Sequence, residues 1–373
     1  MPEDSTKRQG STDSSPGRER RRRASAVTVV IAVLSVLGFL FAVRLLGVSV
    51  RDLAPGLGPA LRQSLDPDVA AVGASWLIAY VMLNGSVVAA VAISLFDVGL
   101  VNAHELFLLV VGSRLGAAGM VVLVGALDYL QRREQPLRES VDLGVFTFLV
   151  TQTIYVPVAV VGYYTLALVR NSTVVPGWVL GPVAGPMALL TRVVEGVVGS
   201  IGGGAGFLLA IVIFLASLRA FDRLFTRMDT AHLRERYLRV LGHPWYSFAI
   251  GLLVTVVTTS VSFSIGVAVP LYNRGHIGRD EMTPYVLGAS LGTLSDTVLV
   301  AVFMGSAEAV LVVLHVFVVG AVLTATVLAR FDSYVAVVDR IQDRLIEDGP
   351  LLVLFFVLLV AVPLALVALA FFS

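Results

Sequence analysis

The sequence predicts an all-α, polytopic membrane protein made of two inverted-topology repeats, each with a re-entrant helical hairpin and a broken helix. Of its 373 residues, 57% are hydrophobic and 14% are charged, whereas soluble domains carry about 25% charged residues. The apolar residues fall in runs of about 20, the length that a helix needs to cross a bilayer. Two of the apolar regions also match each other in sequence. These three observations together predict the fold class.

The chain begins with a polar segment and a first apolar stretch. Residues 1–25 are rich in Ser, Asp, Gly and Arg, a composition that cannot bury a core, so we expect a disordered basic tail. Residues 26–48 form the predicted first transmembrane helix. The arginines before this helix favour a cytoplasmic N-terminus in the plasma membrane, because positively charged flanks stay inside.

Arginine-rich loops predict where the chain returns to the cytoplasm. Residues 131–138, 219–239 and 330–344 carry three, six and three arginines, and we expect all three loops inside. Residues 49–67 and the turn at 96–105 are expected outside. Two apolar stretches lie between residues 67 and 132, but only an odd number of crossings fits these sides. One stretch must therefore enter and return on the same face.

Polar interruptions mark the stretches that are expected to turn back. Asn84, Gly85 and Ser86 interrupt the first, and the segment from Thr258 to Ser262 interrupts its counterpart in the second half. Irregular backbone at membrane depth is tolerated only where it lines a cavity or is buried in protein. We therefore predict a re-entrant hairpin at each place, with both tips facing a shared cavity.

The predicted organisation has five parts. The basic tail (1–25) and the first helix (26–48) precede a first transport repeat, a cytoplasmic arginine-rich linker and a second transport repeat, which cover residues 69–218, 219–242 and 243–373. Within the first repeat, residues 174–204 are rich in Gly and Pro. They are expected to form either another partial entry into the membrane or an outer loop.

The two repeats align without gaps when Leu77 is paired with Leu253 and Val124 with Val300. Over this repeat alignment, 15 of 48 positions are identical. The shared residues include glycines and a glutamate, which apolar composition alone does not explain. Two copies that start on opposite sides of the membrane are typical of secondary transporters. The repeat alignment therefore predicts a transporter without reference to any family.

The sequence also resembles the sodium/phosphate cotransporter family (type II), as a divergent prokaryotic member. Gly288 to Thr293 reads GASLGT and is similar to the family motif Gly-Ala-Asn-Ile-Gly-Thr, and Gly112 to Ala117 resembles it more loosely. The family carries a Gln-Ser-Ser-Ser-Ala motif at each hairpin tip. The matching positions here are Leu83 to Val87 and Thr259 to Phe263. The glutamines are missing and the serines are fewer.

This resemblance implies a site for phosphate and sodium where the interrupted helices meet. Helix N-termini and hydroxyl groups can bind an anion, and hydroxyl and carbonyl oxygens can bind sodium. The alternative is that these small residues only pack helices closely. The candidate substrate- and ion-binding residues are Asn84, Ser86, Ser113, Arg114, Thr258, Thr259, Ser260, Ser262, Ser290, Thr293, Ser295 and Asp296. Sodium is expected at Thr259, Ser260, Ser262 and Asp296.

Two charged residues stand inside apolar runs, where a charge is costly and usually functional. Arg114 could bind the anion directly, or it could pair with Asp296 and serve the structure only. Asp296 could instead take a sodium ion or a proton. The sequence leaves these alternatives open.

The leading functional hypothesis is sodium-coupled symport of inorganic phosphate by alternating access. The alternatives are a carrier of another small anion, coupled to protons through Asp296, and a non-transporting scaffold that kept the fold. The sequence contains no nucleophile–base set, phosphate-cradling loop or cysteine, so we expect neither an enzyme nor a resident cofactor. A net charge of +1 gives no reason to expect nucleic acid. The expected partners are the anion, Na⁺ and the lipid bilayer. The first helix could either pack on the repeats or contact a second copy in a homodimer, and the sequence leaves this open.

Overall fold

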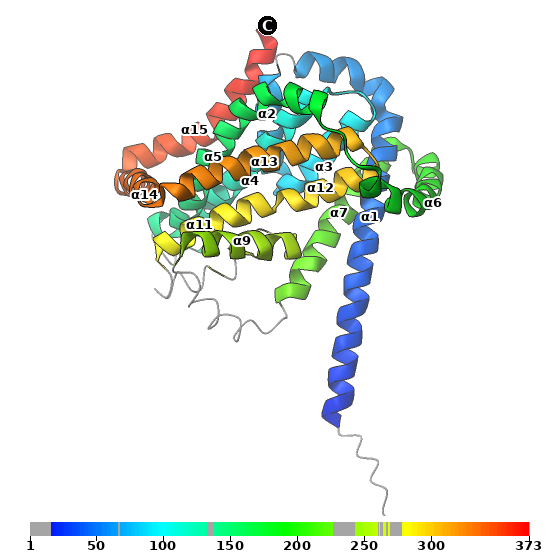
Figure 1. Cartoon of the computed structure of the whole chain (residues 1–373), viewed down its shortest axis with the longest axis horizontal. Coiled ribbons are helices and arrows are strands. Elements are labelled where there is room, and N and C mark those ends of the chain that lie inside the picture. The colour runs from blue at the N-terminus through cyan, green and yellow to red at the C-terminus, as the bar shows by residue number, and fades with distance from the viewer. Residues whose placement is uncertain are drawn as a thin grey trace, which may run out of the picture.

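The computed structural model describes residues 16–65, 68–132, 137–226, 243–259, 261, 264, 265, 268 and 278–372. Every regular element in these residues is a helix (Figure 1). The helices are α1 (Pro16–Ser64), α2 (Val69–Met82), α3 (Gly85–Asp97), α4 (Ala103–Arg132), α5 (Leu137–Ser172), α6 (Gly177–Ile201), α7 (Gly203–Thr226), α9 (Pro244–Thr258), α11 (Arg279–Gly292), α12 (Leu294–Met304), α13 (Ala307–Ala329), α14 (Phe331–Glu347), α15 (Gly349–Ala368) and the 3₁₀ turn η1 (Leu369–Phe371).

Within the described residues, eight helical spans are long and apolar enough to cross a membrane. A helix suits this environment because it satisfies its own backbone hydrogen bonds, which lipid cannot do. The expectation of an all-α, polytopic membrane protein is therefore confirmed. The span formed by α4 is the most buried of the eight, and α2, α3, α5 and α13 pack against it.

Two elements differ in extent from the sequence-based expectation. The first helix, α1, is longer at both ends than residues 26–48, and its N-terminal turns run out of the bundle (Figure 1). Residues 174–204, expected as a partial entry or an outer loop, form the helix α6, with prolines at 182 and 186 inside it. Glycine and proline therefore did not prevent a helix here.

The same helix contact occurs twice, at positions that the repeat alignment pairs. A Cβ added at Gly112 would meet the carbonyl oxygen of Val72, and one added at Gly288 would meet that of Phe248. The offset of 176 residues that pairs Gly112 with Gly288, extended N-terminally beyond Leu77, also pairs Val72 with Phe248 and Trp76 with Leu252. The glycines therefore bring α4 against α2 and α11 against α9 by the same close approach.

A second pair of glycines repeats this relation one turn further along. A Cβ added at Gly116 would lie 2.5 Å from the carbonyl oxygen of Trp76, and a Cβ added at Gly292 would lie 2.9 Å from the carbonyl oxygen of Leu252. Small residues spaced by four let helix backbones approach closely. The shared glycines of the two sequence repeats are thus explained by matched packing of two helix pairs.

The start of the second helix in each pair is also built alike. The backbone N–H of Asn102 donates to Glu105 Oε2 at 2.5 Å, and that of Gly278 donates to Glu281 Oε2 at 3.0 Å. A glutamate at the third helical position commonly caps the helix in this way. The glutamate shared by the two repeats is therefore a capping residue.

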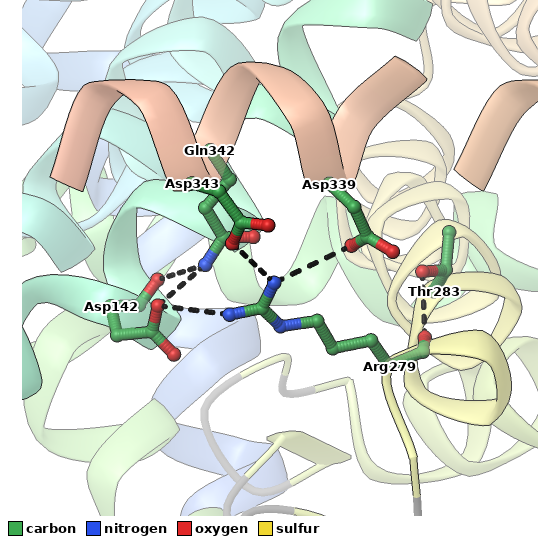
Figure 2. A network of polar contacts seen from close by, with 6 residues as sticks. All are labelled: Asp142, Arg279, Thr283, Asp339, Gln342 and Asp343. Atoms are coloured by element: carbon green, nitrogen blue, oxygen red, sulfur yellow. Dashed lines mark hydrogen bonds and ion pairs between the residues drawn. The ribbon is translucent and has the colours of Figure 1, made fainter. Parts of the chain in front are cut away.

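One end of the molecule gathers loops that the sequence predicts on the inner side. Arg279, at the start of α11, donates to Asp343 of α14 at 2.8 Å and forms longer ion pairs with Asp339 and Asp142 (Figure 2). The Gln342 side chain donates to the Asp142 carboxylate at 2.7 Å. The starts of α5 and α11 are thereby tied to α14.

A second set of polar contacts includes residues in or beside the segments that are expected outside. Arg51 and Asp97 form an ion pair at 3.8 Å, and Arg170 pairs with Glu308 at the start of α13. The Tyr163 hydroxyl donates to the Asp68 carboxylate at 2.8 Å. These contacts therefore involve a different set of residues from the Arg279 cluster.

Candidate functional site

The first interruption lies between α2 and α3. Leu83 has a left-handed backbone conformation, with φ of 52°, which is uncommon for a residue other than glycine. Asn84 then caps α3, because its Oδ1 accepts hydrogen bonds from the N–H groups of Ser86 and Val87 at 2.8 and 3.2 Å. The chain thus breaks where the sequence predicts it, and the N-terminus of α3 begins at this break.

The second interruption has the same backbone signature. Helix α9 ends at Thr258, and Thr259 has φ of 52°. The repeat alignment pairs Thr259 with Leu83, and these are the two residues other than glycine with positive φ in the described part of the chain. The candidates Ser260 and Ser262 lie outside the described residues.

The broken helix expected opposite each tip needs correction. In the first repeat α4 runs without interruption from Ala103 to Arg132, so the expectation of an unwound helix at Ser113 is wrong. The Ser113 hydroxyl donates to the carbonyl oxygen of Val110 at 2.6 Å. The glycines around Ser113 are used for packing against α2, which requires a regular helix.

In the second repeat the break is confined to one residue. Helix α11 ends at Gly292 and α12 begins at Leu294, with Thr293 between them in right-handed helical conformation. The Thr293 hydroxyl donates to the carbonyl oxygen of Ser290 at 2.6 Å, and the Tyr155 hydroxyl donates to the same oxygen at 2.9 Å. Side chains thus supply bonds to the carbonyl at this junction.

A cavity of about 130 Å³ lies where the two interruptions meet. A single water needs about 10–15 Å³ by this measure, so the central cavity has room for several waters or a small oxyanion. Six of the candidates predicted from sequence line it: Asn84, Ser86, Arg114, Thr259, Ser290 and Thr293. They come from both repeats.

Four other candidates do not line the central cavity. Ser113 and Thr258 donate to carbonyl oxygens of their own helices, while the Ser295 hydroxyl is buried without a partner among the described residues. Asp296 is 1% exposed and lies behind the cavity wall. These residues can act on a ligand only through their neighbours in this conformation.

A buried chain of polar groups joins Arg114 to Asp296. Arg114 donates from Nη2 to the Thr297 hydroxyl at 3.0 Å, and that hydroxyl donates to Asp296 Oδ1 at 2.9 Å. Arg114 Nε and Asp296 Oδ2 are buried without hydrogen-bond partners among the described residues. The two charges therefore face each other through one hydroxyl, and each keeps one unsatisfied atom.

Sequence reasoning missed the wall of the cavity formed by α5. Thr147, Thr151 and Tyr155 line the cavity, and their spacing of four residues places them on one helix face. Leu218 and Asp222 of α7 line it from another side. The repeated hydroxyl spacing in α5 was a readable signal, whereas the approach of α7 depends on tertiary packing.

The fold and the cavity together define the class of protein. This is an all-helical, multi-pass membrane protein with a cavity between interrupted helices that is lined by both polar and apolar side chains.

The comparison with protein families then points to one particular family. Residues 213–338 match the family model described as Na+/Pi-cotransporter, which confirms the resemblance to the sodium/phosphate cotransporter family. The match covers less than half of the chain and includes Thr259, Ser290, Thr293 and Asp296. It leaves out the first interruption and Arg114. No curated protein and no solved structure matches.

Proposed function

We propose that the protein is a secondary active transporter that carries inorganic phosphate together with sodium across the plasma membrane. The central observation is the cavity itself, where two helix interruptions at aligned positions of the repeats meet hydroxyl groups and one arginine. The family match over the second half supports phosphate and sodium as the transported ions.

In this proposal the two halves are inverted repeats, and α2–α3 and the segment after α9 are re-entrant hairpins. Arg51, Asp68 and Asp97, in or beside the segments expected outside, make contacts separate from the Arg279 cluster, which supports this arrangement. The N-terminus is cytoplasmic, and the Arg279 cluster marks the inner end. Alternating access would then expose the central cavity to one face at a time.

The proposed anion site combines one charged hydrogen-bond donor with several uncharged ones. The N-terminus of α3 presents backbone N–H groups near Asn84 and Ser86, and helix N-termini attract anions. Arg114 adds a permanent positive charge, and Ser290 and Thr293 add hydroxyl groups. Sodium would bind oxygen atoms at Thr259 and the neighbouring Ser260 and Ser262. Asp296 would become its charged ligand only in another conformation of the transport cycle, because in this one it lies behind the cavity wall.

A second candidate, a carrier of another small anion, is favoured by one observation. Arg114 stands where the family motif has Asn, and its guanidinium offers a forked set of donors to any carboxylate or oxyanion. The remaining alternative, a scaffold that does not transport, predicts that no anion is taken up at all.

Uptake into proteoliposomes separates these functions. Purified protein is reconstituted, and uptake of labelled phosphate and of labelled sulfate is measured with an inward sodium gradient, with a proton gradient alone, and with neither. Uptake that needs sodium supports the proposal. Phosphate or sulfate uptake driven by protons alone supports the second candidate, and absence of uptake of every tested anion contradicts transport.

A further inference from the structure

Helix α5 presents three hydroxyl side chains to the central cavity, and their bonding differs. Thr147, Thr151 and Tyr155 are 3%, 5% and 1% exposed and lie one turn apart on the same face of α5. None of the three belongs to the two repeat motifs from which the candidate site was predicted. They form a separate wall between the two helix interruptions.

The hydroxyl of Tyr155 is already committed to the protein. It donates to the carbonyl oxygen of Ser290 at 2.9 Å, where α11 gives way to α12. This bond holds the junction and leaves no proton for a ligand.

The hydroxyls of Thr147 and Thr151 can still form hydrogen bonds with a ligand. The Thr147 hydroxyl is buried and has no hydrogen-bond partner among the described residues. The Thr151 hydroxyl has a long contact of 3.4 Å with the Ser290 hydroxyl. Threonines elsewhere on α5 differ, because Thr153 and Thr165 donate to carbonyl oxygens of their own helix at 2.8 Å.

A buried hydroxyl without a partner is unfavourable unless a ligand or water completes it. Thr147 and Thr151 face a cavity of about 130 Å³ that also holds the Arg114 side chain on its wall. Hydroxyl donors beside a fixed positive charge bind an oxyanion well, since each O–H can point at an anion oxygen. Unsatisfied hydroxyls at such a place indicate a binding surface.

We propose that Thr147 and Thr151 bind the transported oxyanion directly, an inference that rests on the transport function proposed above. Thr151 lies beside Ser290 at the level of the helix interruptions. Thr147 lies one turn nearer the start of α5, the end at which Asp142 contacts Arg279. The two hydroxyls therefore form successive contacts for an anion that moves between the interruptions and the proposed inner face.

The test uses the isosteric variants Thr147→Val and Thr151→Val, with Thr326→Val as a matched control. Thr326 is exposed on α13, and its hydroxyl donates to the carbonyl oxygen of Val322 at 2.9 Å. Sodium-driven phosphate uptake is measured against phosphate concentration in proteoliposomes of each protein. Loss of one hydrogen bond to a charged ligand raises KM about tenfold, so we expect this rise in both α5 variants and none in the control.

Thermal stability distinguishes ligand binding from a structural role. Valine at position 147 removes an unpaired buried hydroxyl, so the melting temperature without phosphate is expected to stay the same or to rise. The stabilisation that added phosphate gives to the original protein should shrink in the same variant. A melting temperature that falls while KM stays unchanged would mean that the threonines only support the fold.

The outcomes also separate this inference from the proposed function. If the original protein takes up phosphate and both variants match it in KM, the α5 inference is overturned and the transport function stands. If the original protein neither takes up phosphate nor is stabilised by it, the proposed function fails and the inference fails with it.

Discussion

Arg114 and Asp296 are the residues whose charge the fold has to accommodate. Both are buried, and a single hydroxyl, that of Thr297, connects them. Buried charges that lose their partner are strongly destabilising, whereas replacing both charges is often close to neutral. The pair is therefore expected to behave as one unit in folding.

Replacement of Arg114 by methionine should leave the Asp296 carboxylate without its positive partner. We expect the free energy of unfolding to fall by about 3–5 kcal/mol. The double variant Arg114→Met with Asp296→Asn should recover most of this loss. Melting temperatures in detergent check the prediction, and equal values for the single and double variants would show that the two charges do not interact.

Asp339 is a second residue whose charge opposes folding. Burial raises the pKa of its carboxyl group, and Asp280 and Asp343 raise it further, while Arg279 acts in the opposite direction. A raised pKa means that the fold favours the protonated form. Its contribution to stability is therefore present at acidic pH and is lost as the pH rises through the pKa of the folded protein.

The variant Asp339→Asn should accordingly melt at a higher temperature than the original protein near neutral pH. The difference should shrink as the pH falls towards the ordinary carboxyl range and both proteins become neutral at this position. Asp343→Asn is the matched control, because it removes the negative charge from the group that accepts the 2.8 Å bond from Arg279 and should lower the melting temperature. A variant at 339 that is less stable at neutral pH would show that its ion pair outweighs burial.

At the scale of helices, the glycine contacts are the structural feature that the two helix pairs share. Gly112 and Gly288 let α4 and α11 touch the backbones of α2 and α9. Alanine at either position would place a methyl group against a backbone carbonyl, which cannot move aside as a side-chain end can. Overpacking of this kind costs about 1–3 kcal/mol.

We expect Gly112→Ala and Gly288→Ala to lower the melting temperature by similar amounts, because the two contacts correspond. Gly196→Ala on α6 is the control, since an added Cβ there meets nothing within 4 Å and alanine favours helix. A loss in only one of the two variants would indicate that the helix pairs are not packed alike.

Much of the helix architecture could be read from sequence, and the reasons are local. Apolar runs, turn residues at Asn84 and Gly85 and the repeated glycines each specify structure within a few residues. The continuity of α4 through Ser113 could not be read in this way. A serine beside glycines suits both a break and a close helix contact, and only the position of α2 decides between them.

The candidate site was predictable to a similar degree. Residues beside the interruptions, such as Ser86, Thr259 and Ser290, do line the central cavity. Thr147 and Thr151 were missed. Their four-residue spacing indicates a shared face of α5, but an uninterrupted helix does not show which neighbour that face meets. Asp296 was expected at the cavity and lies behind it, held by Thr297.

For the whole molecule, the central claim is that two similar halves stand upside down relative to each other in the membrane, each with a hairpin that returns to its own side. The chain has no cysteine, so single cysteines can report which face each position reaches. Suitable positions flank the two hairpins: Val69 and Asp97 for the first, His243 and Gly278 for the second.

The most direct test is labelling of these four single-cysteine variants in intact cells with a thiol reagent that does not cross membranes. We predict labelling of the cysteines at 69 and 97 from outside, and labelling of those at 243 and 278 only after the membrane is permeabilised. Labelling of all four from the same side, or of 69 and 97 from opposite sides, would contradict the inverted arrangement.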